Sequence, residues 1–208
     1  MSIAATRRPW LPYVAPMAAY MLVMLLETKT NLVWVYPAKV ALVAALLWVF
    51  HNCYEELKPK WSAVPLAVAV GLVAIGFWIF LDPYYPQFKS TPFNPEGKWL
   101  FIAYRVAGAV LVVPLMEELF WRGFLIRWLV EEDFKTVPVG TFTLMSFTAT
   151  TVLFGMEHNQ WLAGLICGAL YNWLYCRTRS VFACVVAHAV SNAALASWVL
   201  WSGDWKFW

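Results

Sequence analysis

Charged residues are scarce in this sequence. Asp, Glu, Lys and Arg make up 13% of its 208 residues, whereas soluble domains carry about 25%. Hydrophobic residues make up 62%, which is more than a water-soluble core can bury. This balance excludes a soluble globular domain. The net charge of +3 comes from loops between apolar runs, so a nucleic-acid partner is not predicted.

Sequence features of several common site types are also missing. The four cysteines form no CxxC pair and three of them lie in or beside apolar runs, so neither a disulfide framework nor a zinc ribbon is predicted. The chain contains no HExxH zinc motif, no GxGD aspartate motif and no sequence typical of a Ser–His dyad. These absences exclude the better-known zinc, aspartate and serine hydrolase designs.

Long apolar runs dominate what is present. A helix needs about 20 mostly apolar residues to cross a bilayer, and such runs would stay exposed in water. The polar turns between the runs are short and leave no room for a second domain. We therefore predict one all-α, polytopic transmembrane helix bundle over residues 1–208, with about seven to eight membrane helices around a polar intramembrane cavity. The seven candidate spans are Leu11–Leu26, Leu32–Phe50, Trp61–Leu81, Trp99–Trp121, Val137–Met156, Trp161–Cys176 and Val181–Trp201.

The ends of these runs predict how the bundle is oriented. Many of the 14 Trp residues sit there, as in the aromatic belt of a membrane interface. Most loop cations fall on the side of the N-terminus, which predicts a cytoplasmic N-terminus and an outer C-terminus. An eighth, re-entrant or interfacial segment would have to lie within 124–138. The cations assigned to the inner side are Arg7, Arg8, Lys58, Lys60, Arg122, Arg127, Lys135, Arg177 and Arg179, and those assigned to the outer side are Lys29, Lys89, Lys98 and Lys206.

Ionisable residues inside the apolar runs are costly and must face a cavity or a partner. Lys39 and Arg105 lie near span ends, so we expect them to extend to the lipid headgroups. Glu117 and Glu118 directly follow an apolar run, and Glu118 shares a helix face with Arg122, with which it can pair. Glu117 points elsewhere and lacks such a partner, which suits a general base. Alternatively, both acids only solvate an interfacial helix end.

Histidine is rare, with three residues in the chain. His158 ends one apolar run, four residues after Phe154, and His188 lies four residues before Asn192 on the same face of the last helix. A single membrane histidine is often only a hydrogen-bonding group between helices. Together with Glu117, however, these residues supply a base, a second proton-transfer group and hydrogen-bond donors for the addition of water to a carbonyl. A peptide bond is the natural substrate of such a set.

Three ordered motifs resemble those of the CAAX-type intramembrane endopeptidase family (CAAX proteases and bacteriocin-processing enzymes). They lie within residues 99–200 and read Glu117-Glu118-x-x-x-Arg122, Phe154-x-x-x-His158 and His188-x-x-x-Asn192. The stretches PLMEELFWRGFLIR, FGMEHNQWLAG and AHAVSNAAL are most similar to the bacterial CAAX prenyl protease-related subgroup, which is associated with exosortase systems.

The resemblance implies a glutamate-dependent endopeptidase in a bacterial inner membrane. Glu117 and His158 would activate a water. His188 and Asn192 would hold the oxyanion, and the acid–arginine pair of the first motif would support the site. No cofactor is expected, although zinc held by Glu117 and the two histidines is an alternative. The expected substrate is the tail of a membrane-anchored protein or peptide, and components of a sorting system would be its partners.

Two other interpretations stay open. A transporter or channel could use buried Glu, Arg and His side chains as a proton path, but the sequence shows neither an inverted repeat nor matching broken helices. A catalytically silent scaffold or immunity-type protein could keep the fold to bind partners, although it has no chemical need for Glu117 and both histidines.

The enzyme interpretation sets a geometric condition, because Glu117 and His158 must lie at the same depth. A long, tilted helix from about Trp99 to Val130 and a short helix before His158 would satisfy it. We then expect Glu117, His158, His188 and Asn192 to line one pocket.

Overall fold

The apolar runs form helices close to where the sequence predicts them. The computed structural model describes residues 8–28, 30–88 and 93–207, and within these ranges it contains helices and turns but no strand, which confirms the all-α fold class. The main helices are α2 (Leu11–Met24), α3 (Leu32–Val49), α4 (Val64–Leu81), α5 (Trp99–Ala107), α6 (Val113–Glu118), α7 (Ile126–Trp128), α8 (Leu144–Met156), α9 (Trp161–Thr178) and α10 (Val181–Ser202). Short 3-10 helices cover His51–Cys53, Glu55–Leu57, Trp61–Ala63, Asp82–Tyr84 and Trp205–Phe207.

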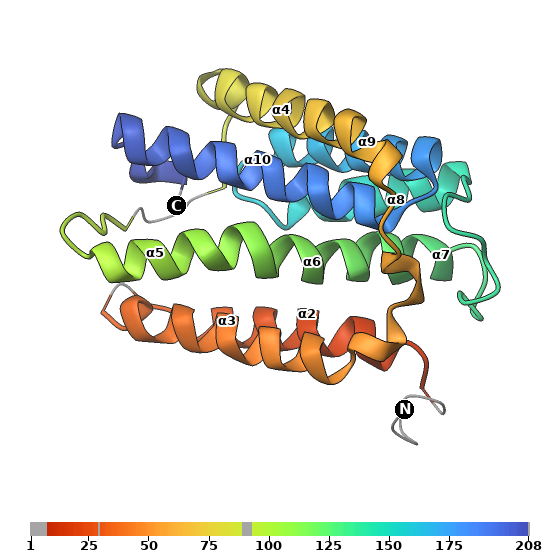
Figure 1. The fold of residues 1–208 in the computed structure, drawn as a ribbon. Coiled ribbons are helices and arrows are strands. Elements are labelled where there is room, and N and C mark those ends of the chain that lie inside the picture. The colour runs from red at the N-terminus through yellow and green to blue at the C-terminus, as the bar shows by residue number, and fades with distance from the viewer. Residues whose placement is uncertain (1–7, 29, 89–92, 208) are drawn as a thin grey trace.

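Several of these helices are long and apolar enough to cross a membrane. They extend over Leu32–Val49, Trp61–Tyr84, Trp99–Trp128 and Val181–Ser202, while α2 and α8 are shorter apolar helices. All main helices run roughly along one common direction, as Figure 1 shows. The described residues therefore have the architecture of a helical membrane bundle.

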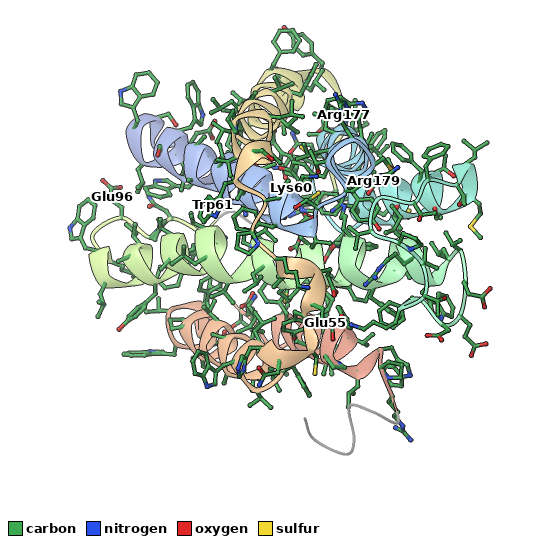
Figure 2. All side chains as sticks on the ribbon, turned by 45° about the vertical axis from the view of Figure 1, so that its right-hand side comes forward. Glu55, Lys60, Trp61, Glu96, Arg177 and Arg179 are labelled. Carbon is green, nitrogen blue, oxygen red and sulfur yellow. The ribbon has the colours of Figure 1, made fainter. Side chains whose placement is uncertain are left out.

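Several loop cations lie at one end of the bundle, where Glu55 also lies (Figure 2). α2 and α4 begin at one end, and α10 ends at the opposite one (Figure 1). Figure 2 shows Lys60, Arg177 and Arg179 at the end that faces the viewer, whereas Glu96 lies away from them. This clustering of cations agrees with the predicted topology, although the cytoplasmic placement of this end stays a prediction. The other cations used for that prediction include Arg7, Lys29 and Lys89, which lie outside the described residues.

The segment that carries the two adjacent acids is one continuous helix from Trp99 to Trp128, close to the predicted length. It consists of α5, α6 and α7 joined by π-helical turns at Gly108–Val112 and Leu119–Leu125. Pro114 has no N–H and would clash with the preceding turn of a regular α-helix, and it lies directly after the first π-helical turn. The wide turns thus flank α6 and its two acids, and such turns are frequent at functional sites.

α8 is short, as the site geometry required. Its 13 residues span about 20 Å at 1.5 Å per residue, which is less than the ~30 Å of a hydrocarbon core. The Thr143 hydroxyl caps its start by accepting from Ser146 N. The turn that follows Met156 lines the central cavity. Within 124–138, the residues after the long helix form turns and bends, so this fully described segment holds no eighth membrane helix.

Small residues allow the site-bearing helices to pack closely. A Cβ atom at Gly71 on α4 would overlap Ala187 O on α10. A Cβ at Gly164 on α9 would lie 3.0 Å from the Cα of Gly155 on α8. Close approach through small residues is typical of membrane helix bundles, where helices gain stability from tight van der Waals contact. These contacts hold α4 against α10 and α8 against α9.

Candidate active site

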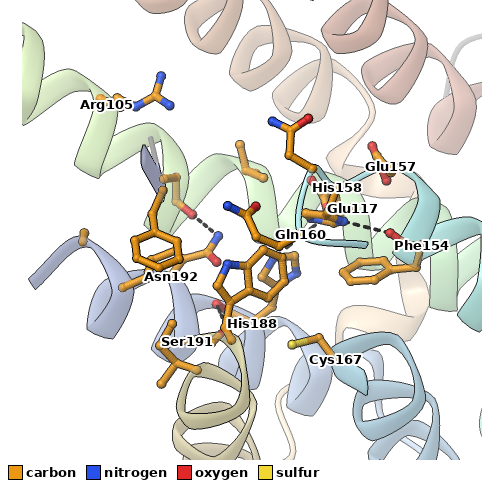
Figure 3. A pocket seen from close by; sticks show the side chains of 18 of the residues that line it. Arg105, Glu117, Phe154, Glu157, His158, Gln160, Cys167, His188, Ser191 and Asn192 are labelled. Carbon is orange, nitrogen blue, oxygen red and sulfur yellow. Dashed lines mark hydrogen bonds and ion pairs between the residues drawn. The ribbon is translucent and has the colours of Figure 1, made fainter. Parts of the chain in front are cut away.

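A polar cavity of about 330 Å³ lies between α6, α10 and the turn after α8. Glu117 reaches it from α6, His158 from the turn, and His188 and Asn192 from α10. Figure 3 shows these side chains around one common space. The prediction that the four residues share one pocket is confirmed. Their chemical roles stay predictions.

Glu117 and His188 face each other across the cavity. The Oε2 atom of Glu117 lies 4.0 Å from Nε2 of His188. Glu117 is 5% exposed and His188 is 4% exposed, and the Glu117 Oε2 atom has no hydrogen-bond partner among the described residues. Buried carboxylate oxygens normally have partners, so this one is available to a water or a substrate group.

His188 is held from its other side by the second acid. Its Nδ1 lies 2.9 Å from Oε1 of Glu118, and the same oxygen accepts a hydrogen bond from Arg122 Nη1 at 3.0 Å. An ionised carboxylate only accepts hydrogen bonds, so the proton lies on Nδ1 of His188. The predicted Glu118–Arg122 pair is therefore confirmed, and it contacts a site histidine directly.

Arg122 connects this pair to the neighbouring helices. Glu118 and Arg122 are both 0% exposed. The Arg122 guanidinium also donates to Asn172 Oδ1 at 3.0 Å and to Gly168 O at 3.1 Å, both on α9. Asn172 in turn donates to the hydroxyl of Thr150 on α8 at 2.9 Å. A continuous polar network thus links α10, α6, α9 and α8 and pairs the buried charges of Glu118 and Arg122, while Glu118 Oε2 has no hydrogen-bond partner among the described residues.

His158 is oriented by the chain just before it. Its Nδ1 lies 2.8 Å from Phe154 O, and because a carbonyl only accepts, this nitrogen carries the proton. The Nε2 atom therefore has a lone pair. The ring packs at 4.9 Å from the Phe154 ring and edge-on at 5.3 Å from Trp78. The spacing of four residues between Phe154 and His158 is thus explained by both a hydrogen bond and a ring contact.

Asn192 contacts the long helix at its first π-helical turn. Its Nδ2 donates to Ala109 O at 2.8 Å. A π-helical turn interrupts the regular backbone ladder, and here the amide of Asn192 supplies a partner for one of its carbonyls. Only one of the two N–H groups of Asn192 is used in this bond. The second remains for a ligand in the cavity.

The cavity is also lined by polar residues that the sequence interpretation did not select, among them Glu157, Gln160, Tyr171 and Ser191. The Tyr171 ring stacks on His188 at 5.3 Å. Its hydroxyl lies 2.6 Å from Ser191 Oγ, which donates to His188 O at 2.9 Å. Glu157 had a sequence signal, since it is an acid directly beside His158 in a chain with few acids. Tyr171 and Ser191 had none, because both are compatible with ordinary helix packing.

Lys39 and Arg105 also line the cavity, and the expectation that Lys39 reaches the headgroups is wrong. Its side chain is 2% exposed, and its Nζ lies 2.7 Å from Oε1 of Glu27. The ammonium also lies 4.0 Å from the centre of the Tyr20 ring. A buried anion and an aromatic face therefore replace the solvation that the headgroups would give.

The 3-10 turn Trp205–Phe207 contributes to the wall of the cavity. Lys206 and Phe207 line the cavity. Lys206 Nζ lies 2.7 Å from Asp82 Oδ2 and 3.1 Å from Asp204 Oδ2. The hydrogen bond to Asp82 raises the pKa of Lys206 above its usual value, so the Lys206 ammonium stays charged across the neutral range. It ties the end of α10 to the end of α4.

The zinc alternative stays a prediction. Among the described residues, no cluster of three or more His, Cys, Asp or Glu side chains is arranged to hold a metal ion. A catalytic zinc takes three protein ligands at about 2.0–2.3 Å from one point.

The fold and the cavity define a helical membrane protein with a buried Glu–His–His–Asn site. Residues 98–194 match the sequence profile of the family described as "Rce1-like: Type II CAAX prenyl endopeptidase Rce1-like". The match covers just under half of the chain and contains all residues of the three motifs. It supports the resemblance to CAAX proteases, and the narrower exosortase-associated subgroup stays a prediction. No curated protein and no solved structure matches the chain.

Proposed function

We propose that this chain is a CAAX-type intramembrane endopeptidase that uses Glu117 to hydrolyse a peptide bond. One observation carries the proposal: the buried Glu117 Oε2 has no partner among the described residues and lies 4.0 Å from His188 Nε2. His158 and Asn192 line the same cavity. The family match over residues 98–194 supports the reaction class.

In the proposed reaction, Glu117 takes a proton from a water held between its carboxylate and His158. Because His158 Nδ1 donates to Phe154 O, its Nε2 accepts the second hydrogen of that water. The resulting hydroxide attacks the carbonyl carbon of the peptide bond. Glu117 then returns its proton to the leaving nitrogen as the C–N bond breaks. The proposal needs no cofactor.

The negative charge on the carbonyl oxygen is assigned to Asn192 and His188. Asn192 has a second amide N–H for this purpose while the first donates to Ala109 O. His188 already uses Nδ1 for Glu118, so donation from Nε2 requires a second proton on its ring. The mechanism therefore has a condition, namely that His188 is doubly protonated while Glu117 accepts a proton.

The proposed substrate is the tail of a membrane-anchored protein or peptide, cleaved in a bacterial inner membrane with the N-terminus of the chain in the cytoplasm. The long apolar helices support a multi-pass membrane protein. The clustering of loop cations at one end supports the orientation. Components of a sorting system are the proposed partners.

The test compares cells that carry the native chain, Glu117→Ala or Glu132→Ala. Glu132 is exposed in a loop and serves as the matched control. An uncleaved membrane protein should accumulate with Glu117→Ala only, because the base is lost. Tail peptides of that protein should then be cleaved by the purified native chain in vesicles.

Two results would change the proposal. Identical membrane proteomes for all three strains would contradict the protease and favour a silent scaffold. Cleavage that a chelator abolishes and added zinc restores would contradict the metal-free mechanism, while it would leave the peptidase activity in place.

A further inference from the structure

The imidazole ring of His188 is fixed at one edge and covered on one face. Glu118 Oε1 lies 2.9 Å from its Nδ1 atom, but a single hydrogen bond leaves the ring able to tilt, because the χ2 torsion of histidine is broad. The Tyr171 ring lies nearly parallel to the imidazole, with 5.3 Å between the ring centres and 28° between the planes. The Phe154 ring meets it at 72° and 6.0 Å. Stacking thus restricts the tilt that the bond to Glu118 leaves free.

Tyr171 itself has little freedom to move. It lies on α9 and is 1% exposed. Ser191 Oγ donates to His188 O at 2.9 Å, and a serine hydroxyl carries one proton, so the Tyr171 hydroxyl donates to Ser191 Oγ at 2.6 Å. This path of contacts starts at the ring of His188 and returns to its backbone. The centre of the same tyrosine ring lies 5.5 Å from Arg122 Cζ, so Tyr171 packs against both groups that are bonded to Glu118 Oε1.

We infer that Tyr171 is a positioning residue that acts through His188. Its ring face keeps Nε2 of His188 directed into the cavity, where this atom lies 4.0 Å from Glu117 Oε2. The inference rests on the proposed function, in which Nε2 donates to the carbonyl oxygen of the substrate. A displacement of about 1 Å in an active site can cost about 10²-fold in rate. The orientation of His188 therefore limits the reaction, and Tyr171 sets it together with Glu118.

A buried tyrosine could also serve packing alone, and the chain offers a comparison. Tyr175 lies one turn later on α9 and is 0% exposed. It belongs to the same hydrophobic core as Tyr171, but Tyr171 lines the central cavity and Tyr175 is not one of the described residues that line it. Replacing either ring by leucine removes a similar buried area. The two replacements differ in that the one at Tyr171 uncovers the ring of His188.

The first test measures the orientation of His188 by NMR and needs no cleavage. The chain contains three histidines, so labelling the full chain with carbon-13 at the histidine Cε1 position gives three signals in nanodiscs. His51→Gln and His158→Gln assign two of them, which leaves the signal of His188. A stacked aromatic ring shifts such a signal upfield through its ring current. The His188 signal should keep its position in Tyr171→Phe and in Tyr175→Leu, and it should move downfield in Tyr171→Leu.

The second test measures cleavage of a tail peptide by the same variants in vesicles. Tyr171→Leu should lower kcat by up to about 10²-fold, with little change in KM, because the bond from His188 to the substrate oxygen strengthens in the transition state. Tyr171→Phe keeps the ring face and loses one hydrogen bond, so its kcat should stay within about fivefold of the native value. Tyr175→Leu should lower the melting temperature about as much as Tyr171→Leu but keep the native kcat.

Several results would overturn the inference. A native kcat or an unmoved His188 signal in Tyr171→Leu would show that the stack positions nothing. A loss of kcat in Tyr175→Leu as large as in Tyr171→Leu would reduce the role of Tyr171 to packing, and an equal loss in Tyr171→Phe would assign the role to the hydroxyl instead of the ring face. Tyr171→Met replaces Tyr171→Leu if the latter does not fold, since methionine fills irregular spaces. If the native chain cleaves no tail, the proposed function fails, and the His188 signal still decides whether Tyr171 orients the ring.

Discussion

Replacing Arg122 with leucine removes the guanidinium that contacts Glu118, and the polar network of the site determines the effect. Both side chains are 0% exposed, and Arg122 Nη1 lies 3.0 Å from Glu118 Oε1. Breaking a buried pair from one side costs about 3–5 kcal/mol, because a buried charge is left behind. For a chain of this size, that corresponds to a decrease in Tm of about 6–20 °C.

The double variant Arg122→Leu/Glu118→Leu separates stability from chemistry. It leaves no buried charge, so most of the lost stability should return. Activity should remain lost, because His188 Nδ1 no longer has the acceptor that now lies at 2.9 Å. Thermal unfolding in detergent, followed by tryptophan fluorescence, and tail cleavage measure the two effects.

Arg177→Leu is the control for these variants, since Arg177 is exposed at the end of α9. It should change neither Tm nor cleavage. If Arg122→Leu melted at the native temperature, or if the double variant melted as low as the single one, the assignment of a buried charge network would be refuted.

Two further variants test the packing and the oxyanion site. Gly71→Val places a Cβ where it overlaps Ala187 O and should destabilise the bundle by about 1–3 kcal/mol. Gly76→Val is the control and should not destabilise it, because nothing lies within 4 Å of its added Cβ. Equal melting temperatures for the two variants would contradict the close α4–α10 packing. Asn192→Ala should reduce kcat about 10²–10³-fold, as expected for one oxyanion donor, with little change in KM; a native kcat would exclude Asn192 from the reaction.

The helices could be predicted from the sequence because membrane spans carry a strong signal. A run of about 20 apolar residues has few alternatives to a helix across the bilayer, and the predicted spans agree with the described helices to within a few residues at most ends. The largest shift of a helix start is at α8, which begins at Leu144 instead of Val137. The segment before it contains Pro138 and Gly140, and Gly140 adopts a φ of +91°, which excludes a helix there.

The site was predictable only where rare ionisable residues marked it. Glu117, His158 and His188 stand out because a charged or titratable group is costly inside a span. The orientation of His188 by Glu118 could not be predicted, because it depends on how α6 and α10 are placed against each other. The same holds for Lys39, since the sequence does not show that Glu27 in the preceding loop folds back toward it.

The spacing of Glu118 and Arg122 also bears on how this helix enters the membrane. An isolated Arg or acid at the centre of an inserting helix costs about 2.5–3.5 kcal/mol, and the long helix carries both types. Because the two residues are four apart on one helix, their ion pair forms within the helix and needs no contribution from another helix. Asn172 and His188, from α9 and α10, are synthesised later and join a pair that already exists. This span therefore carries its own counterion when it enters the translocon.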